Sequence, residues 1–494
     1  MKMTINKKRV IALIILIAST SIIAFLNLRI QYNLDLFYMW HVSRCVATRG
    51  QHLYKDINII ATPLSVYLEC IPALISNSYI FWDICIMLPL FIAVAFISFK
   101  IFRHFSIDYI WSAVFTGIIL FMFPGITINV YNGYTMLITY IVLYLFLSRK
   151  NKPDIKFSII LGLLCFISFD LKQTNGLFLS LGCMICGYIL CKKTCEKEEV
   201  HKKYIKMLLG AIGIFLIGTI IQLLIIYSLG ELPSFIDQMT GIKYFKSDIK
   251  TRTIVLCIAG IEILCYGIIN KKYKVHNEIQ YIEILSILVM FRPFGYLDMS
   301  HFEHAFSLFI VTLLIIIDKK LVTENKGRLK VGLIEITSVL SIVFVFWDSL
   351  IFNTPIDAIL HPETGNYAFA SRYAEAINSY IDKHDGTYAV IDYGYGNFAN
   401  EIVNRKYVKY NDIILLGNTG TTKQIDVINN LNEDYIIMLD KNNYYLPQIS
   451  NETYNLIESF NLKDSIDIGP YNNDPQIYYR YIHVNVYENP NKNN

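Results

Sequence analysis

Hydrophobic residues in this chain occur in long runs rather than in the short amphipathic patterns of a soluble domain. A hydrocarbon layer about 30 Å thick is crossed by a helix of about 20 apolar residues, with a lower limit near 17. Some of the runs approach that limit, which indicates tilted or broken helices. The pattern predicts eleven membrane-spanning helices, over residues 9–28, 79–102, 107–128, 132–148, 157–171, 175–191, 207–229, 253–270, 279–292, 304–318 and 331–352.

The pattern changes after residue 352. Strands of roughly alternating character alternate with short amphipathic helices, which is typical of a small α/β domain. The pair Gly394 and Gly396 lacks the third glycine of a dinucleotide-binding turn and indicates a simple turn. We therefore predict a transmembrane domain over 1–352 and an α/β domain over 353–494. The predicted strands are 387–392, 434–440 and 478–486, and the predicted helices are 371–384, 422–431 and 452–460.

Composition agrees with a membrane protein. Of the 494 residues, 54% are hydrophobic and 17% are charged, whereas soluble domains have about 25% charged residues. The net charge of +4 is small and gives no indication that the protein binds nucleic acid. Ten cysteines are present and the last is Cys265, so the C-terminal domain is predicted to lack disulfides. The closely spaced cysteines 183/186 and 191/195 have no matching second pair, which favours structural roles over a metal site.

Lysine and arginine predict the orientation, because cytoplasmic loops are enriched in both. The N-terminal apolar run continues without a small-residue cleavage site, so it is predicted to be a retained helix with its N-terminus in the cytoplasm. Every second loop along the chain is then basic, and residues 353–494 lie outside a plasma membrane. The basic segments are 2–9, 100–103, 149–156, 192–206, 271–274 and 319–330.

Two of the predicted outer loops are long, covering residues 29–78 and 230–252. The first contains a short apolar segment, Pro63–Ile75, and the second has apolar residues at helical spacing from Phe235 to Phe245. Both segments are too short to span a bilayer and are predicted to lie along its surface.

The first outer loop supplies two candidate catalytic acids. Asp35 follows the first helix, and a partly buried carboxylate there can act as a general base toward an acceptor hydroxyl. The alternative is an acid in the first turn of the helix that follows. Asp56, beside Tyr54, can position an acceptor or a metal ion together with Asp35. The alternative for Asp56 is a solvated loop acid.

Two further predicted outer segments carry candidate phosphate ligands. Lys172 lies in Asp170-Leu-Lys-Gln-Thr-Asn175 and offers a point charge to phosphate. The alternative is an Asp170–Lys172 pair that ties a tight turn. Arg292 can clamp phosphate oxygens in a bidentate manner. His301 and His304 share one helical face and are candidate site or metal residues, or interfacial anchors.

The order of these features resembles the first extracytoplasmic loop of the GT-C membrane glycosyltransferases. That superfamily includes the protein O-mannosyltransferases and the aminoarabinose transferases of lipid A, and the resemblance is to its bacterial members. The matching features are Asp35, an aromatic-rich helix, Gly50-x-x-x-Tyr54-Lys-Asp56 and Pro63-Leu64. The segment 169–176 is similar to a T-K-Q-x-x-G turn of bacterial members, and His301-Phe302 is similar to their last outer loop. The resemblance covers roughly residues 1–350.

The resemblance implies transfer of a hexose or pentose from a polyprenyl-phosphate donor, with inversion, to an extracytoplasmic acceptor that is a surface glycan, lipid or protein. Asp35 and Asp56 match the catalytic acids of the family loop, and Lys172 and Arg292 would face the lipid phosphate. Many members have Asp-Glu where this chain has Asp35-Leu36, so a divalent metal is left open.

Three other functions remain as alternatives. A polysaccharide polymerase or ligase would use a pyrophosphate donor and usually has a long late outer loop, whereas the long loop comes first here. A transporter would show repeated halves and broken mid-membrane helices, and no such repeat is evident. A membrane receptor with a sensing tail would leave the loop acids unexplained.

Overall fold

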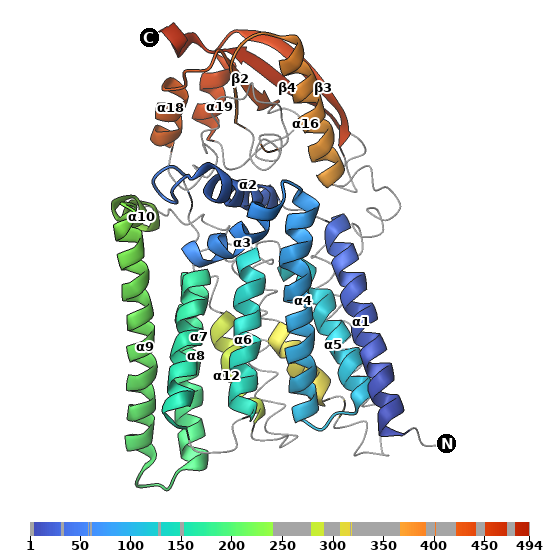
Figure 1. The fold of residues 1–494 in the computed structure, drawn as a ribbon, viewed down its shortest axis with the longest axis vertical. Helices are drawn as coiled ribbons and strands as arrows, with labels where there is room; N and C mark the ends of the chain where they lie inside the picture. The colour runs from blue at the N-terminus through green and yellow to red at the C-terminus, as the bar shows by residue number, and fades with distance from the viewer. Residues whose placement is uncertain are drawn as a thin grey trace. The chain divides into compact units, whose positions relative to one another are not determined.

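The computed structural model describes a helical protein with one small sheet. It describes residues 4–30, 34–57, 59, 62–126, 130–148, 153–240, 278–290, 307–316, 318, 366–391, 401, 421–440, 450–471 and 480–493. The chain forms two compact units (Figure 1). The first comprises residues 1–27, 86–223 and 246–352, and the second comprises 28–85, 224–245 and 353–494. The second unit thus joins the C-terminal tail to two segments from the predicted outer loops.

Within the described ranges, five helices are long and apolar enough to cross a membrane, which supports the prediction of a helical membrane protein. Shorter apolar helices occupy further predicted spans, and the spans 253–270 and 331–352 lie outside the described residues. The helices that correspond to predicted spans are α1 (Ile5–Ile30), α4 (Tyr79–His104), α5 (Tyr109–Ile126), α6 (Val130–Ser148), α7 (Ile155–Leu171), α8 (Gln173–Thr194), α9 (Val200–Ser228), α12 (Ile279–Met290) and residues 307–316.

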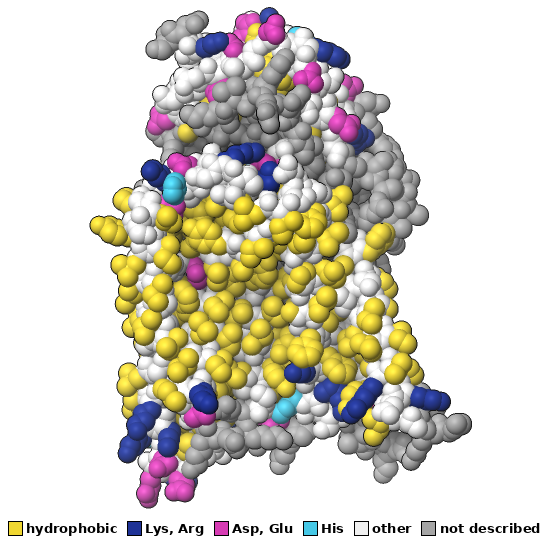
Figure 2. Space-filling view, in the orientation of Figure 1, with side chains coloured by type: hydrophobic (Ala, Val, Ile, Leu, Met, Phe, Trp, Pro, Cys, Tyr) yellow, Lys and Arg dark blue, Asp and Glu magenta, His cyan; other side chains and the backbone are white. Residues whose placement is uncertain are grey.

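Packing in the first unit centres on α6, α7, α8 and α12, which contact one another. Helix α7 begins where the Asp154 side chain accepts a hydrogen bond from the Phe157 amide at 2.8 Å, a standard N-cap. Helix α9 exposes most of its apolar residues, and only 6% of its most hydropathic window is buried. Apolar side chains cover the visible face of these helices (Figure 2). An apolar surface of this extent is what a bilayer-facing helix requires.

Basic side chains gather at one end of the helical unit (Figure 2). Lys8 at the start of α1 pairs with Asp108 at 2.6 Å, just before α5. Arg103, at the end of α4, lies 3.8 Å from the centre of the Tyr109 ring. At the same end of α4, His104 contacts Glu278 at 3.0 Å. These residues belong to loops that the charge pattern predicts to be cytoplasmic, and they meet in space.

The second unit contains the predicted α/β domain. Its four-stranded sheet has the order β1-β2-β4-β3, with β1 parallel to β2 and the other pairs antiparallel. The predicted strands and helices are confirmed, and one strand, β3, is an addition. The elements are α16 (Asn366–Lys383), β1 (Tyr388–Val390), α18 (Thr421–Asn429), β2 (Tyr435–Leu439), α19 (Asn451–Glu458), β3 (Leu462–Tyr471) and β4 (Arg480–Glu488).

Strand β3 was missed because it lies at the edge of the sheet. Residues 461–465 are exposed, so they lack the apolar alternation that marks a half-buried strand. The pairing of β3 with β4 also shifts register twice, between Leu462 and Asp464 and between Asp467 and Gly469. Such bulges interrupt the two-residue period on which sequence recognition depends.

Three helices from the predicted outer loops complete the second unit. They are α2 (Leu34–Arg49), α3 (Pro63–Ile75) and α10 (Leu232–Thr240). Helix α3 packs on α2 and begins with Pro63, whose fixed φ suits a first helical turn. One face of α3 exposes Leu68, Ile71 and Leu74 while the other buries Ser65 and Glu69. An exposed apolar face of this kind suits the membrane-surface position that the sequence predicts for this segment.

Candidate functional site

The densest group of ionisable side chains among the described residues lies on α2 in the second unit. His41, Arg44, Cys45 and Arg49 occupy successive turns of one helical face, where residues three and four apart are neighbours. All four surround Glu401, whose side chain is 1% exposed. Its carboxylate lies 2.6 Å from Nδ1 of His41, 3.4 Å from Nε of Arg44 and 2.9 Å from Nη2 of Arg49. Residues 360 positions apart in the sequence therefore form one ionic cluster.

Positive charge exceeds negative charge in this cluster. Burial disfavours the charged form of Glu401, but the hydrogen bond from His41 and the charges of His41, Arg49 and Arg44 outweigh it, so the pKa of Glu401 is lowered. Burial works against the charge of Arg49, but Glu401 and Cys45 outweigh it and raise the Arg49 pKa. Two guanidinium groups thus share one ionised carboxylate.

Cys45 completes the cluster. Its Sγ lies 3.5 Å from Nε2 of His41, and Nη1 of Arg49 donates to the same sulfur at 3.2 Å. Arg44 also donates to the Ala73 carbonyl at 2.7 Å, which ties α2 to the end of α3. The cluster therefore both holds the loop helices together and sets a thiol, an imidazole and a carboxylate side by side.

A second buried acid, Glu69, lies on α3. The side chain is fully buried, and neither carboxylate oxygen has a hydrogen-bond partner among the described residues. Burial raises the pKa of Glu69 well above its ordinary value, as expected for a desolvated carboxyl group. Its backbone carbonyl accepts a hydrogen bond from the Trp82 indole at 3.0 Å, which fixes the helix in place. Burial without a hydrogen-bond partner among the described residues therefore favours the neutral form of Glu69 over the charged form.

The predicted acids of the first outer loop belong to two segments of the second unit, helix α2 and the turn that follows it. Asp35 lies in the first turn of α2, and its side chain lies outside the described residues. Asp56 is exposed, and its carboxylate accepts a hydrogen bond from the His52 amide at 2.8 Å, closing a tight turn. Tyr54 in that turn adopts φ of 64°, is buried, and packs edge-on against Phe235 of α10 at 5.0 Å. These contacts hold Asp56 and Tyr54 in the loop, as the alternative of a solvated loop acid predicts for Asp56.

The Lys172 segment lies in the first unit. Lys172 is the single residue between α7 and α8, and its extended backbone reverses the chain. Its Nζ donates to Oδ1 of Asn132 at 3.1 Å and lies 5.1 Å from the centre of the Tyr131 ring. Asn175 donates to Oγ of Ser168 at 2.8 Å across the same turn. The turn therefore presents a cation held by an amide oxygen and an aromatic face.

The chain reversal at Lys172 is tightly packed. Gly176 lies so close to Phe169 that an added Cβ would meet the Phe169 Cα at 2.2 Å. Asp170, at the end of α7, bonds to Gln222 of α9. The polar residues of the turn are thereby fixed from both neighbouring helices.

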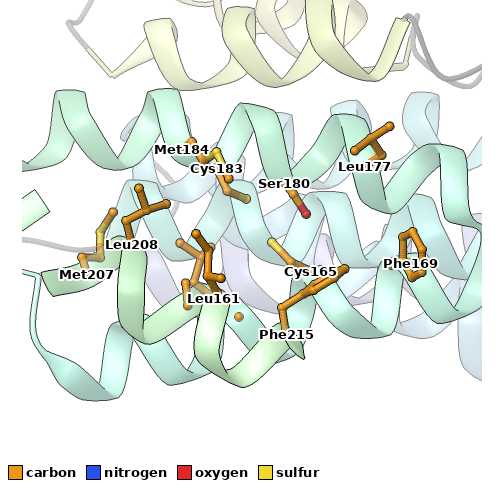
Figure 3. Close-up of a pocket in the computed structure, with 13 residues that line it drawn as sticks. Leu161, Cys165, Phe169, Leu177, Ser180, Cys183, Met184, Met207, Leu208 and Phe215 are labelled. Atoms are coloured by element: carbon orange, nitrogen blue, oxygen red, sulfur yellow. The ribbon is translucent and has the colours of Figure 1, made fainter. Parts of the chain in front are cut away.

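An apolar groove of about 290 Å³ runs along α7, α8 and α9 (Figure 3). Phe169 and Leu177, which line one end, are three and five residues from Lys172, so that end begins within about two helical turns of the cation. Helices α7 and α9 approach closely here because Gly162 packs against the Ala211 backbone. The residues lining the groove are Leu161, Gly162, Cys165, Phe169, Leu177, Ser180, Cys183, Met184, Met207, Leu208, Ala211, Ile212 and Phe215.

Three predicted site residues, Arg292, His301 and His304, lie outside the described residues. The α2 cluster and Glu69 were not predicted, although the sequence carried a signal for each. His41, Arg44 and Arg49 follow helical spacing within an aromatic segment, and Glu69 is an isolated acid in an apolar run. Ionisable groups in such surroundings are costly unless they are used or paired.

No protein-family model matches the sequence, and no curated protein shows a significant match to it. Functional inference for this chain therefore depends on its residues and their geometry.

Proposed function

We propose that this protein is a membrane glycosyltransferase that moves a sugar from a polyprenyl-phosphate donor to an extracytoplasmic acceptor. The observation that carries the proposal is the Lys172 turn together with the apolar groove, one end of which lies within about two helical turns of Lys172. A cation at the end of a membrane helix pair and a hydrocarbon-lined groove along the same pair match the two parts of an anionic lipid.

The groove suits a hydrocarbon chain. Its lining is almost wholly apolar, and apolar cavities stay dry and accept apolar ligands. A volume of about 290 Å³ approaches the roughly 300 Å³ at which ligand pockets begin. The donor phosphate would accept hydrogen bonds from Nζ of Lys172, a point charge that binds phosphate in many proteins.

The second unit supports a reaction outside the membrane. It unites residues 28–85, 224–245 and 353–494, three segments that the charge pattern predicts to be on one side. Helix α2 in this unit carries Asp35 in its first turn and a cluster with excess positive charge further along. Buried ionisable groups gathered in one place are typical of functional sites.

The proposed reaction is a single displacement. The acceptor hydroxyl oxygen attacks the anomeric carbon, while the bond from that carbon to the phosphate oxygen breaks and polyprenyl phosphate leaves with the electron pair. The resemblance gives Asp35 the role of the general base that takes the acceptor proton. Lys172, with Arg292 from the resemblance, stabilises the charge that develops on the phosphate.

Purified protein in vesicles containing radiolabelled polyprenyl-phosphate hexose or pentose tests this proposal. Donor turnover is followed as release of polyprenyl phosphate. A mixed surface-glycan extract supplies the acceptor, so the acceptor need not be known in advance. Asp35→Asn should lower turnover by about 100-fold, the usual scale for a general base. Lys172→Gln should raise KM for the donor. Lys192→Gln, an exposed lysine near the other end of α8, is the matched control and should leave both constants unchanged.

Wild-type turnover by the Asp35→Asn variant would contradict the mechanism. Turnover of polyprenyl-pyrophosphate sugars in place of the monophosphates would instead identify a polymerase or ligase. Vectorial movement of an unmodified substrate without release of polyprenyl phosphate would identify a transporter.

A further inference from the structure

Three possible metal ligands converge in the α2 cluster. The sulfur of Cys45, a ring nitrogen of His41 and a carboxylate oxygen of Glu401 all lie within 4.8 Å of one another. Thiolate, imidazole and carboxylate are the three side-chain ligand types that zinc uses, and catalytic sites combine three of them with one open position.

The separation of Cys45 Sγ from His41 Nδ1 is close to that of two ligands of a tetrahedral ion, whereas the separation of His41 Nδ1 from Glu401 Oε1 is shorter. Zinc ligand distances of about 2.0–2.3 Å place two ligands roughly 3.3–3.7 Å apart. Cys45 Sγ lies 3.8 Å from Nδ1 and 3.5 Å from Nε2 of His41. Nδ1 of His41 lies 2.6 Å from Oε1 of Glu401 and would have to separate by roughly 0.7 Å to reach the tetrahedral spacing.

A cation already occupies this position. The Arg49 guanidinium contacts Glu401 Oε1 through Nη2 at 2.9 Å and Cys45 Sγ through Nη1 at 3.2 Å, the two groups that would be anionic ligands. Its side chain is 39% exposed, so it can turn into solvent. Arg44 is 12% exposed, contacts Oε2 of Glu401 and is also held by the Ala73 carbonyl, so it would remain.

We propose that a thiophilic divalent cation of the zinc type binds Cys45 Sγ, His41 Nδ1 and Glu401 Oε1, and that it displaces Arg49 when it binds. The charges of the ligands and of Arg49 explain why the ion would replace the guanidinium. The cation brings two positive charges to two anionic ligands, the Glu401 carboxylate and the Cys45 thiolate, whereas Arg49 brings one. The ion therefore neutralises both ligands, including a deprotonated Cys45 whose charge the guanidinium alone would not offset. The ion would link α2 to residue 401 and stiffen the second unit.

None of the proposed ligands takes part in a chemical step of the proposed sugar transfer, although their cluster lies in the same unit as Asp35. Metal binding can therefore be measured without a substrate. A negative result in one experiment leaves the other unaffected.

The test is titration of metal-free, detergent-solubilised full-length protein with Co²⁺, followed by the thiolate-to-cobalt charge-transfer band, and then displacement with Zn²⁺. We expect one equivalent of tightly bound ion. Cys45→Ser should abolish the band, and Glu401→Gln should weaken binding by at least roughly tenfold. Arg49→Gln should tighten binding by roughly tenfold, because a competing cation is removed.

Cys195→Ser serves as the matched control, since Cys195 lies after α8 in the first unit and should not affect binding. A cobalt band that survives Cys45→Ser in a folded protein would overturn the proposal. If Cys45→Ser fails to fold, Arg49→Gln decides instead, because unchanged or weaker binding in that variant would equally overturn it.

Discussion

Replacing Glu401 by glutamine should destabilise the second unit strongly. The substitution keeps the shape of the side chain but leaves His41, Arg44 and Arg49 without their shared buried counter-charge. A buried ion pair that loses one partner typically costs about 3–5 kcal/mol, because the remaining charge is desolvated and unpaired.

Exposure decides which end of that range applies. Arg49 is 39% exposed and can regain water, and His41 carries a charge only when it is protonated. Arg44 is only 12% exposed and is tied to the Ala73 carbonyl, so it is the charge left behind. One stranded guanidinium places the expected loss near 3 kcal/mol, at the lower end of the range.

Guanidinium unfolding of the detergent-solubilised protein measures this loss. Trp40, fully buried on the same helix as His41, reports the transition through its fluorescence. The matched control is Glu488→Gln, which removes an exposed partner of Lys463 in the same unit and should leave the midpoint unchanged. Wild-type stability of Glu401→Gln, or an equal loss in the control, would refute the assignment of a buried ionic hub.

Three further outcomes follow from the described geometry. The pKa of Glu401 is lowered in the folded protein, so the ion pairs of Glu401 contribute their full stability above the pKa of the unfolded chain, near 4.5. That stability is lost as the pH falls through the folded-state pKa of Glu401. Acid should therefore lower the unfolding free energy of the wild type more than that of Glu401→Gln in the same unfolding assay. Gly176→Ala forces a Cβ against the Phe169 backbone and should destabilise the first unit by about 1–3 kcal/mol in thermal aggregation or unfolding assays. The control is Gly213→Ala, whose added Cβ would meet no atom within 4 Å and should leave the stability unchanged or slightly raised. A reporter fused after Asn353 should give an extracytoplasmic signal, and a cytoplasmic signal would contradict the orientation derived from lysine and arginine.

Spans and tail elements were predictable because each depends on local sequence. Helix α4, predicted over 79–102, extends over Tyr79–His104, and β2, predicted over 434–440, extends over Tyr435–Leu439. Such elements follow from runs of apolar residues or from alternation, which neighbouring residues specify among themselves. The exposed edge strand β3 lacked that local signal.

The candidate site was only partly predictable. Lys172 was singled out as a cation at a helix boundary, and the structure shows it held by Asn132 beside an apolar groove. The groove itself depends on how closely α7 and α9 approach at Gly162 and Ala211, which no single segment specifies. Asp56 was predicted to be a catalytic acid or, alternatively, a solvated loop acid, and the structure shows it exposed and accepting a hydrogen bond from the His52 amide.

By itself, the sequence determined that this chain is an apolar helical protein with a small α/β tail, because hydrophobic period and length act over a few residues. Only the tertiary structure decided that residue 401 is buried among His41, Arg44, Cys45 and Arg49. Contacts across 360 positions arise from packing whole helices, and burial then determines which charges must be paired. The local sequence therefore shows only one part of this ionic cluster, the helical spacing of its residues on α2.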